Sequence, residues 1–103
     1  MAEAPVLLIP CAPRGLTRAE GSVYPAIQNL MLAARARGLG TTLTSLHRED
    51  EASLKDALGI PEEVDTFAII PVGYPLGRWG EAKRSPLREV TFWERWGATR
   101  DDV

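Results

Sequence analysis

The sequence predicts a layered α/β fold in one domain. Two observations support this prediction: short apolar runs with the composition of strands alternate with helical patterns, and the resulting order is strand, helix, strand, helix, strand. The chain has 103 residues, which leaves room for one domain at most. Three strands and two helices make a thin core, so we expect self-association to complete the fold.

The three expected strands cover residues 5–11, 41–46 and 66–72. The first and third, PVLLIPC and TFAIIPV, are apolar on both faces, which is typical of strands buried between two layers. The second, TTLTSL, alternates in polarity and is rich in β-branched residues. Cys11 ends the first run and is expected to be an inert, buried thiol.

The first expected helix, which has Ser22 as its N-cap and stops at Gly38, is apolar around most of its circumference. Pro25 is expected in its first turn, where the missing N–H costs least. A helix that is apolar nearly all round is normally buried, yet a chain of this length has little interior. We therefore expect this helix to lie against a partner surface.

The second expected helix covers residues 51–58, with Asp50 as its N-cap and Gly59 at its end. The third strand is followed by a long loop, residues 73–86, which is rich in glycine and basic residues. Residues 87–96 are expected to begin with a turn or a short helix and to end in an extended conformation. The tail that follows is polar and is expected to fray.

The composition is that of an ordinary globular protein, with 45% hydrophobic residues, 25% charged residues and a net charge of -2. This balance predicts no general attraction to nucleic acid or to anionic membranes. The single cysteine and the single histidine exclude a disulfide framework and a zinc site built from either residue type within one chain. No run has the pattern of a signal peptide or a membrane span, so a cytoplasmic location is expected.

Catalytic constellations are scarce, with no Ser–His–Asp signature and no nucleophile elbow. His47 follows the second strand and could act as a general base, but no carboxylate stands at a telling spacing, so a solvent-facing loop histidine is favoured. Lys83 and Arg84 form a basic pair that could clamp a phosphate through charge-assisted hydrogen bonds. Their chemistry alone favours a solvated surface pair.

Aromatic side chains gather toward the end of the chain: Trp79, Phe92, Trp93 and Trp96. Packing is favoured over ligand stacking for this group. An aromatic arm at a chain end has little of its own domain left to cover, so its packing site is expected on another subunit.

Three segments of the chain resemble the C-terminal half of the FMN-dependent nitroreductase family. They are SVYPAIQNLMLAARARGLGTTLTSLH, DALGIPEEVDTFAIIPVGYP and KRSPLREVTFWERWG. The similarity runs from about Ala4 to Gly97, and the AIQN and VGYP motifs are specific when they occur together. The resemblance assigns residues 1–97 to the C-terminal half of a nitroreductase-like domain and residues 98–103 to a polar tail.

The resemblance implies an α/β (α+β) fold with three layers, truncated here and completed by dimerisation. It also implies bound FMN and transfer of electrons from NAD(P)H to nitroaromatic or quinone-like acceptors. In this picture the apolar helix within residues 22–38 is the core of a homodimer, and the segment TFWERW is an arm that wraps the partner.

The site residues that the resemblance implies fall in two places. Thr44, Ser45 and Leu46 would lie near the flavin ring, although many family members have a glycine near the position of Leu46. Lys83 and Arg84 precede the P-L-x-E-V element and would contact the FMN phosphate. The resemblance therefore favours a phosphate-binding role for this pair over that of a solvated surface pair. No side chain is nominated as catalytic.

The N-terminal half of the family, with its arginine–serine–x–arginine cluster for the phosphate, has no counterpart in this sequence. Each missing charged contact forfeits roughly 1.5–3 kcal/mol of binding. Two hypotheses therefore stand. The chain is a flavin oxidoreductase that acts as a homodimer or with a complementary N-terminal half chain, or it is a truncated, non-catalytic paralogue that serves as a flavin-binding or protein-interaction module.

Overall fold

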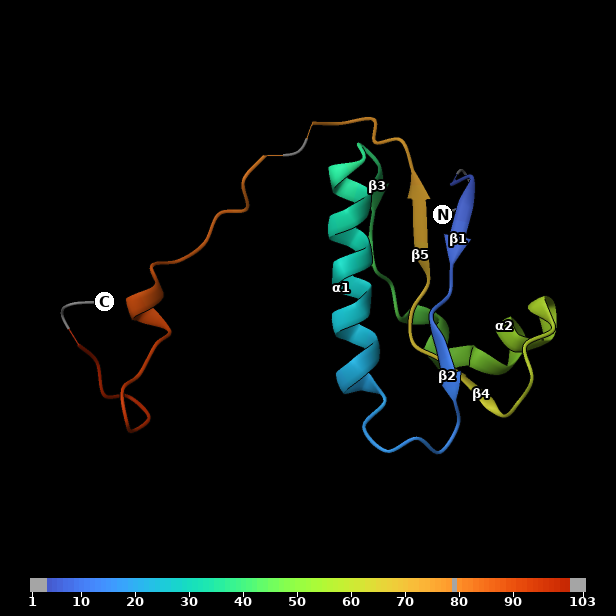
Figure 1. Ribbon diagram of the computed structural model, residues 1–103, viewed down its shortest axis with the longest axis horizontal. Coiled ribbons are helices and arrows are strands. Elements are labelled where there is room, and N and C mark those ends of the chain that lie inside the picture. The colour runs from blue at the N-terminus through green and yellow to red at the C-terminus, as the bar shows by residue number, and fades with distance from the viewer. Residues whose placement is uncertain (1–3, 79, 101–103) are drawn as a thin grey trace.

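The computed structural model describes residues 4–78 and 80–100 and shows a body of mixed helix and sheet with a long C-terminal arm (Figure 1). Trp79 and the last residues of the expected tail, 101–103, lie outside the described residues. The elements of the body are β1 (Val6–Leu8), β2 (Cys11–Pro13), α1 (Glu20–Ala36), β3 (Gly40–Thr41), η1 (Leu46–Asp50), α2 (Glu51–Leu58), β4 (Val64–Thr66) and β5 (Ile70–Gly73). A short 3-10 helix, η2 (Leu87–Glu89), lies in the arm.

The strands form two small antiparallel sheets. One has the order β1-β5-β3, with Leu8 opposite Ile70 and Thr41 opposite Val72. The other pairs β2 with β4 and sets Cys11 opposite Thr66. The pairing is therefore antiparallel throughout the described sheets, whereas the sequence predicted only that strands would alternate with helices.

Each of the three predicted strands is divided or shortened. The run 5–11 breaks at Pro10, which has no N–H to donate and whose carbonyl accepts from the N–H of Phe67 at 3.0 Å. The run 66–72 is interrupted at residues 67–69, where Phe67 bonds to Pro10, so that the two ends of the run pair in different sheets. The run 41–46 keeps ladder pairing at its start, followed by one isolated bridge at Thr44.

Helix α1 begins earlier than predicted, and Ser22 is not its N-cap. The N–H groups of Ser22 and Val23 donate to the carbonyl of Ala19 at 3.0 and 2.9 Å, so the first turn is already formed ahead of Ser22. Pro25 consequently lies inside the helix rather than in its first turn. The predicted end is confirmed: Gly38 adopts φ +80, and the N–H of the next residue bonds back to Ala34.

Helix α2 has the predicted bounds. The carboxylate of Asp50 accepts from the N–H of Ser53 at 3.4 Å, which makes Asp50 the N-cap as expected. Gly59 ends the helix in the left-handed conformation, with φ +71. Both ends of α2 are therefore determined by local signals that the sequence displays.

The core lies between α1 and one face of the three-stranded sheet. Ile27 of α1 packs there with Ala68 and Ile70, and partly buried apolar residues of both elements surround them: Val23, Leu30, Met31 and Val72. The prediction that the first strand is buried on both faces is wrong for the single chain, because Leu7 is 47% exposed. In the third predicted strand, by contrast, residues 66–70 are all buried. In the described chain, α1 covers one face of the sheet, and Leu7 is left open to solvent.

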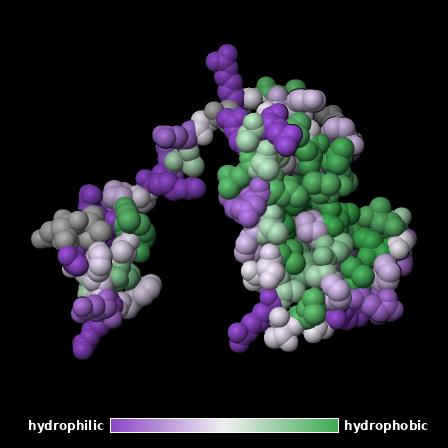
Figure 2. Space-filling model, viewed as in Figure 1, coloured by the Kyte–Doolittle hydropathy of each residue, from purple (hydrophilic) through white to green (hydrophobic). Residues whose placement is uncertain are grey.

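The side of α1 that faces away from the sheet is also apolar. Leu32 is 58% exposed, and Ala33 and Ala36, which follow it in the helix, are exposed as well, together with the polar residues Gln28 and Asn29. Figure 2 shows how widely hydrophobic residues cover the visible side of the body. The near absence of a polar face, predicted from the sequence, thus leaves part of α1 uncovered in a single chain.

The chain after β5 leaves the body and ends at some distance from it (Figure 1). The radius of gyration is 18.1 Å, against about 13 Å expected for a globular domain of 100 residues. The 3-10 helix η2 confirms the predicted turn or short helix. The expected extended ending is wrong, because Glu94 adopts φ +64 and the N–H of Trp93 donates to the carbonyl of Ala98 at 2.8 Å.

The aromatic residues of the arm contact one another. The rings of Phe92 and Trp96 lie 4.7 Å apart at an interplanar angle of 64°. Trp96 nevertheless remains 92% exposed.

Among the described residues, the helices are too short or too polar to span a membrane.

Candidate functional site

The segment that the resemblance places near the flavin ring is a short exposed loop held at both ends. On one side, Thr44 exchanges two backbone hydrogen bonds with Ile69, which precedes β5. On the other, the imidazole Nε2 of His47 lies 2.9 Å from the hydroxyl oxygen of Thr66, at the end of β4. Ser45 and Leu46 lie between these two anchors and are exposed to solvent.

Thr66 is the centre of a buried polar network. It has no exposed surface, and its hydroxyl and its backbone N–H both donate to the carboxylate of Glu51, at 2.8 and 2.9 Å. The ammonium group of Lys55 lies 3.6 Å from the same carboxylate oxygen and donates to the carbonyl of Glu62 at 3.4 Å. Lys55 is only 7% exposed, so the Glu51–Lys55 pair is screened from water more than a surface pair would be.

The hydrogen bonds lower the pKa of Glu51. The largest cause is the bond from the backbone N–H of Thr66, and the Thr66 hydroxyl and the charge of Lys55 act in the same direction against the opposing effect of burial. The carboxylate is therefore ionised wherever the chain is folded at neutral pH. An ionised carboxylate accepts hydrogen bonds only, which sets the direction of every bond in the network.

His47 is not the solvent-facing loop residue that the sequence favoured. It is half-buried, and burial is the main reason that its pKa lies below the ordinary value. Glu51, which is four residues ahead in the chain, opposes this effect, and the neighbouring Arg48 reinforces it. The spacing of His47 and Glu51 across η1 and the start of α2 was the one signal that could have revealed the network, whereas Thr66 lies 19 residues away.

Cys11 is exposed in the single chain, so the expectation of a buried thiol is wrong. Its Sγ donates to the carbonyl of Ile9 at 3.2 Å. Partial burial raises the pKa of the Cys11 thiol, and the charge of Glu51 adds to this effect. The raised pKa favours the protonated thiol at neutral pH, which is a weaker nucleophile than the thiolate.

The structure does not bring the two predicted parts of the flavin site together within one chain. Lys83 and Arg84 are exposed and lie in the connection that leaves the body, whereas Thr44, Ser45 and Leu46 belong to the body (Figure 1). A phosphate held by Lys83 and Arg84 would have to approach from the arm's side, or the arm would have to meet another copy of the body.

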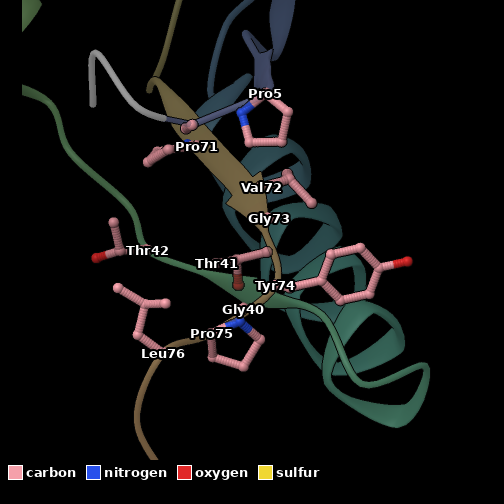
Figure 3. A pocket seen from close by; sticks show the side chains of 11 residues that line it. Pro5, Gly40, Thr41, Thr42, Pro71, Val72, Gly73, Tyr74, Pro75 and Leu76 are labelled. Carbon is pink, nitrogen blue, oxygen red and sulfur yellow. The ribbon is translucent and has the colours of Figure 1, made fainter.

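A cleft of about 450 Å³ lies beside β5, lined by residues of β3, β5 and the VGYP segment. Its wall includes Pro71, Val72 and Gly73 of β5, and Val72 also packs against the core under α1. Figure 3 shows Pro5 at one end of the cleft and Leu76 at the other.

The walls of this cleft are largely apolar and approach one another closely. A Cβ atom on Gly40 would lie 3.2 Å from the side chain of Pro75, and one on Gly73 would lie 3.1 Å from that of Pro5. Among the lining residues Tyr74 carries the one aromatic ring, and this ring projects away from the cleft in Figure 3. The cleft therefore offers an apolar surface rather than acid–base groups. Elsewhere among the described residues, no cluster of acidic, histidine or cysteine side chains could hold a metal ion.

Comparison with known proteins agrees with the fold. The family model described as the nitroreductase family matches residues 1–74. The chain belongs to the nitroreductase family. Its members are flavin oxidoreductases by type, which agrees with the resemblance that the motifs indicated.

Two archaeal relatives carry the same provisional name, NADH dehydrogenase/NAD(P)H nitroreductase. The one from Methanothermobacter thermautotrophicus is 37% identical over 79 residues, which are 71% of this chain and 41% of the relative. The one from Archaeoglobus fulgidus is 36% identical over 52 residues, 48% of this chain and 30% of the relative. The nitroreductase-family chain therefore matches less than half the length of either relative.

The structure of oxidized iodotyrosine deiodinase bound to FMN and 3-iodo-L-tyrosine is similar to that of this nitroreductase-family chain. The TM-score is 0.71 at 26% identity, and the match covers 93% of this chain and 48% of the other. The nitroreductase-type fold is thus confirmed over nearly the whole chain.

Proposed function

We propose that the chain is part of an FMN-dependent NAD(P)H oxidoreductase of the nitroreductase type, which reduces nitroaromatic or quinone-like acceptors. The observation that carries this proposal is the match of 93% of the chain to a structure that holds FMN. In this proposal residues 1–97 form one half of a nitroreductase-like domain, residues 98–103 are a polar tail, and the protein works in the cytoplasm without a nucleic-acid or membrane partner.

The flavin ring would lie against the loop that contains Thr44, Ser45 and Leu46. Support comes from the exposure of Ser45 and Leu46 and from the two anchors that hold the loop ends in place. When bound, FMN would supply the hydride and electron chemistry. The loop would orient the ring with backbone groups, and Leu46, 73% exposed, would exclude water from one edge.

Lys83 and Arg84 would hold the FMN phosphate through charge-assisted hydrogen bonds. Both side chains are exposed, and the arm that carries them extends away from its own body. The arm is therefore available to a second subunit, and a homodimer in which each arm serves the partner's loop would unite the two halves of the site.

The assembly that completes the site is a homodimer or a complex with a complementary N-terminal half chain. Two uncovered apolar surfaces support a partner of this kind: the outer side of α1 with Leu32, and the sheet face with Leu7. Burial of such surfaces contributes about 25 cal/mol per Å² of apolar area. In a single chain these apolar surfaces stay exposed to water, and the stabilisation from their burial is not gained.

The absorption spectrum of the purified protein tests the proposal. Flavin bands together with oxidation of NAD(P)H in the presence of a nitroaromatic or a quinone are expected. The double variant K83A/R84A should weaken FMN retention and leave oligomerisation intact, whereas R78A/R88A, which removes the same charge from the same arm, should retain FMN. Equal retention in both double variants would show that the phosphate assignment is wrong.

A second candidate function is a non-catalytic module that pairs with another protein or holds flavin loosely. The observation that favours it is the separation, within one chain, of Lys83 and Arg84 in the arm from the loop that contains Ser45 and Leu46. This candidate predicts a colourless oligomer that rejects added FMN and oxidises no NAD(P)H. A yellow protein with turnover excludes it.

A further inference from the structure

We propose that His47, Thr66 and Glu51 form a latch that fixes the Ser45–Leu46 loop, and that His47 acts through this latch as a positioning residue for the flavin. The inference rests on the proposed function, because it assigns a role to residues behind the loop that the flavin would contact. The latch residues themselves do not touch the ring in this assignment.

The direction of each hydrogen bond in the latch follows from the ionised carboxylate. Glu51 can only accept, so the hydroxyl of Thr66 donates its single proton to Glu51 at 2.8 Å. That hydroxyl then has only lone pairs left for His47, and the Nε2 atom of His47 must donate across the 2.9 Å contact. His47 is therefore the Nε2–H tautomer when it is neutral.

The latch lies at the position that controls the loop. Thr44 is tied by its backbone to Ile69, and His47 is tied by its side chain to Thr66, so only Ser45 and Leu46 lie between the anchors. The first anchor consists of backbone groups and tolerates most substitutions. The second consists of side chains, and its loss would leave the far side of the loop held only by the local bond from the N–H of Arg48 to the carbonyl of Ser45 at 3.1 Å.

The surroundings of His47 make the latch sensitive to acid. Its Nδ1 atom is buried and has no hydrogen-bond partner, so a proton added there would become an unpaired buried donor. The charged groups that act on the ring are Arg48 of η1 and Glu51 of α2. Lys55 of α2 and Cys11 of β2 interact with Glu51 in turn. Among these, Glu51 is the group that favours the protonated ring, and its carboxylate is already engaged by Thr66 and Lys55.

The sign of the pH effect follows from the direction of the shift. Burial lowers the pKa of folded His47 below its ordinary 6.5, so the latch contributes its full stability above pH 6.5 and loses it as the pH falls through the folded pKa. Glu51 also has a lowered pKa, and its contribution is lost only at still lower pH, below its ordinary 4.5. As the pH falls, the contribution of His47 to stability therefore begins to decline before that of Glu51.

Two pairs of variants test the latch in the full chain. H47Q keeps an N–H donor at a similar reach and cannot titrate, whereas H47L removes the donor. T66S keeps the hydroxyl, whereas T66V keeps the shape and removes it. The two readouts are the dissociation constant for FMN between pH 5 and 8 and the hydrogen exchange of the loop amides in flavin-free protein, with circular dichroism to confirm folding.

We expect H47L and T66V to weaken FMN binding about five- to tenfold at pH 7.5, as the loss of one buried hydrogen bond implies, and to speed exchange at the amides of Thr44 and Leu46. H47Q and T66S should stay near wild type. Wild-type binding should weaken as the pH falls through the lowered pKa of His47, below 6.5, and H47Q should show no such decrease. A purely structural role of the side chain would not produce this difference between wild type and H47Q.

Two outcomes overturn the inference, and they are distinguishable. If wild type binds FMN and the four variants match it in affinity and in exchange, the latch is wrong and the proposed function stands. If wild type takes up no FMN, the proposed function fails together with the flavin role of His47, and the exchange data then decide separately whether the latch fixes the loop.

Discussion

Thr44 and Ile69 exchange two backbone hydrogen bonds, with N···O distances of 3.1 Å from the N–H of Thr44 and 2.8 Å from the N–H of Ile69. They form an isolated antiparallel bridge outside both sheets. Because Ile69 directly precedes β5, this bridge transmits the position of the central strand to the exposed Ser45–Leu46 loop. The network around Thr66 does the same from the end of β4.

Replacement of Glu51 by glutamine should lower the stability of the fold by about 1–3 kcal/mol, because the acceptor of the buried Thr66 bonds loses its charge. The loss should be largest above pH 4.5 and should shrink as the pH falls through the lowered pKa of Glu51, where the wild type loses the same contribution. Urea unfolding at several pH values measures this difference. D56N on the exposed side of α2 is the matched control, and equal effects of the two variants would contradict the assignment.

Gly38→Ala should destabilise the chain by roughly 1–2 kcal/mol, because Gly38 ends α1 with φ +80 and a left-handed residue with a Cβ is strained. No heavy atom lies within 4 Å of the added Cβ, so the cost is conformational rather than steric. Gly21→Ala is the control: it lies within α1, also meets nothing within 4 Å, and should stabilise by about 0.5–1 kcal/mol. Thermal unfolding of the two variants should shift in opposite directions.

Leu32→Glu should dissociate the proposed dimer and leave the single chain folded. Leu32 is 58% exposed on the outer side of α1, so the charge costs little in the monomer and would be buried without a partner in an α1–α1 interface. Light scattering against concentration should show a dissociation constant raised by more than about tenfold, which corresponds to more than about 1.4 kcal/mol. Leu16→Glu, at 59% exposure in the loop before α1, is the control and should not change the mass.

Trp96→Ala should weaken the same assembly if the arm crosses to the partner. The side chain is 92% exposed in the single chain and touches only Phe92 among ring contacts of the described residues, so its removal should barely change the unfolding of a monomer. Tryptophan anchors at interfaces typically contribute about 2 kcal/mol or more. A shortened chain without residues 90–103 should show the same weakening in light scattering, and an unchanged dimer would show that the arm does not cross over.

The ends of a helix could be predicted from the sequence wherever they depend on capping residues within the segment itself. The bounds of α2 follow from an N-cap and a left-handed glycine that lie within the segment, and the same holds for the glycine that ends α1. The start of α1 was missed because Ala19 provides no side-chain cap, and the first turn forms through backbone bonds alone. A helix start without a capping side chain has no sequence signature to read.

The candidate site was only half readable for a similar reason. The position of the Ser45–Leu46 loop came from a family motif, whereas the role of His47 depends on Thr66, a partner 19 residues away whose neighbourhood only strand pairing creates. Lys83 and Arg84 stand apart from the loop, because the arm that carries them extends away from the body.

The amino-acid order alone determined the bounds of α2, the end of α1, the apolar character of α1 and the family to which the chain belongs, because helix caps, periodicity and motifs act over a few neighbouring residues. The tertiary structure decided how the strands divide between two sheets, which residues anchor the exposed loop and which apolar faces stay open. These features depend on contacts between segments distant in the chain, whose energies exist only once the sheet has formed.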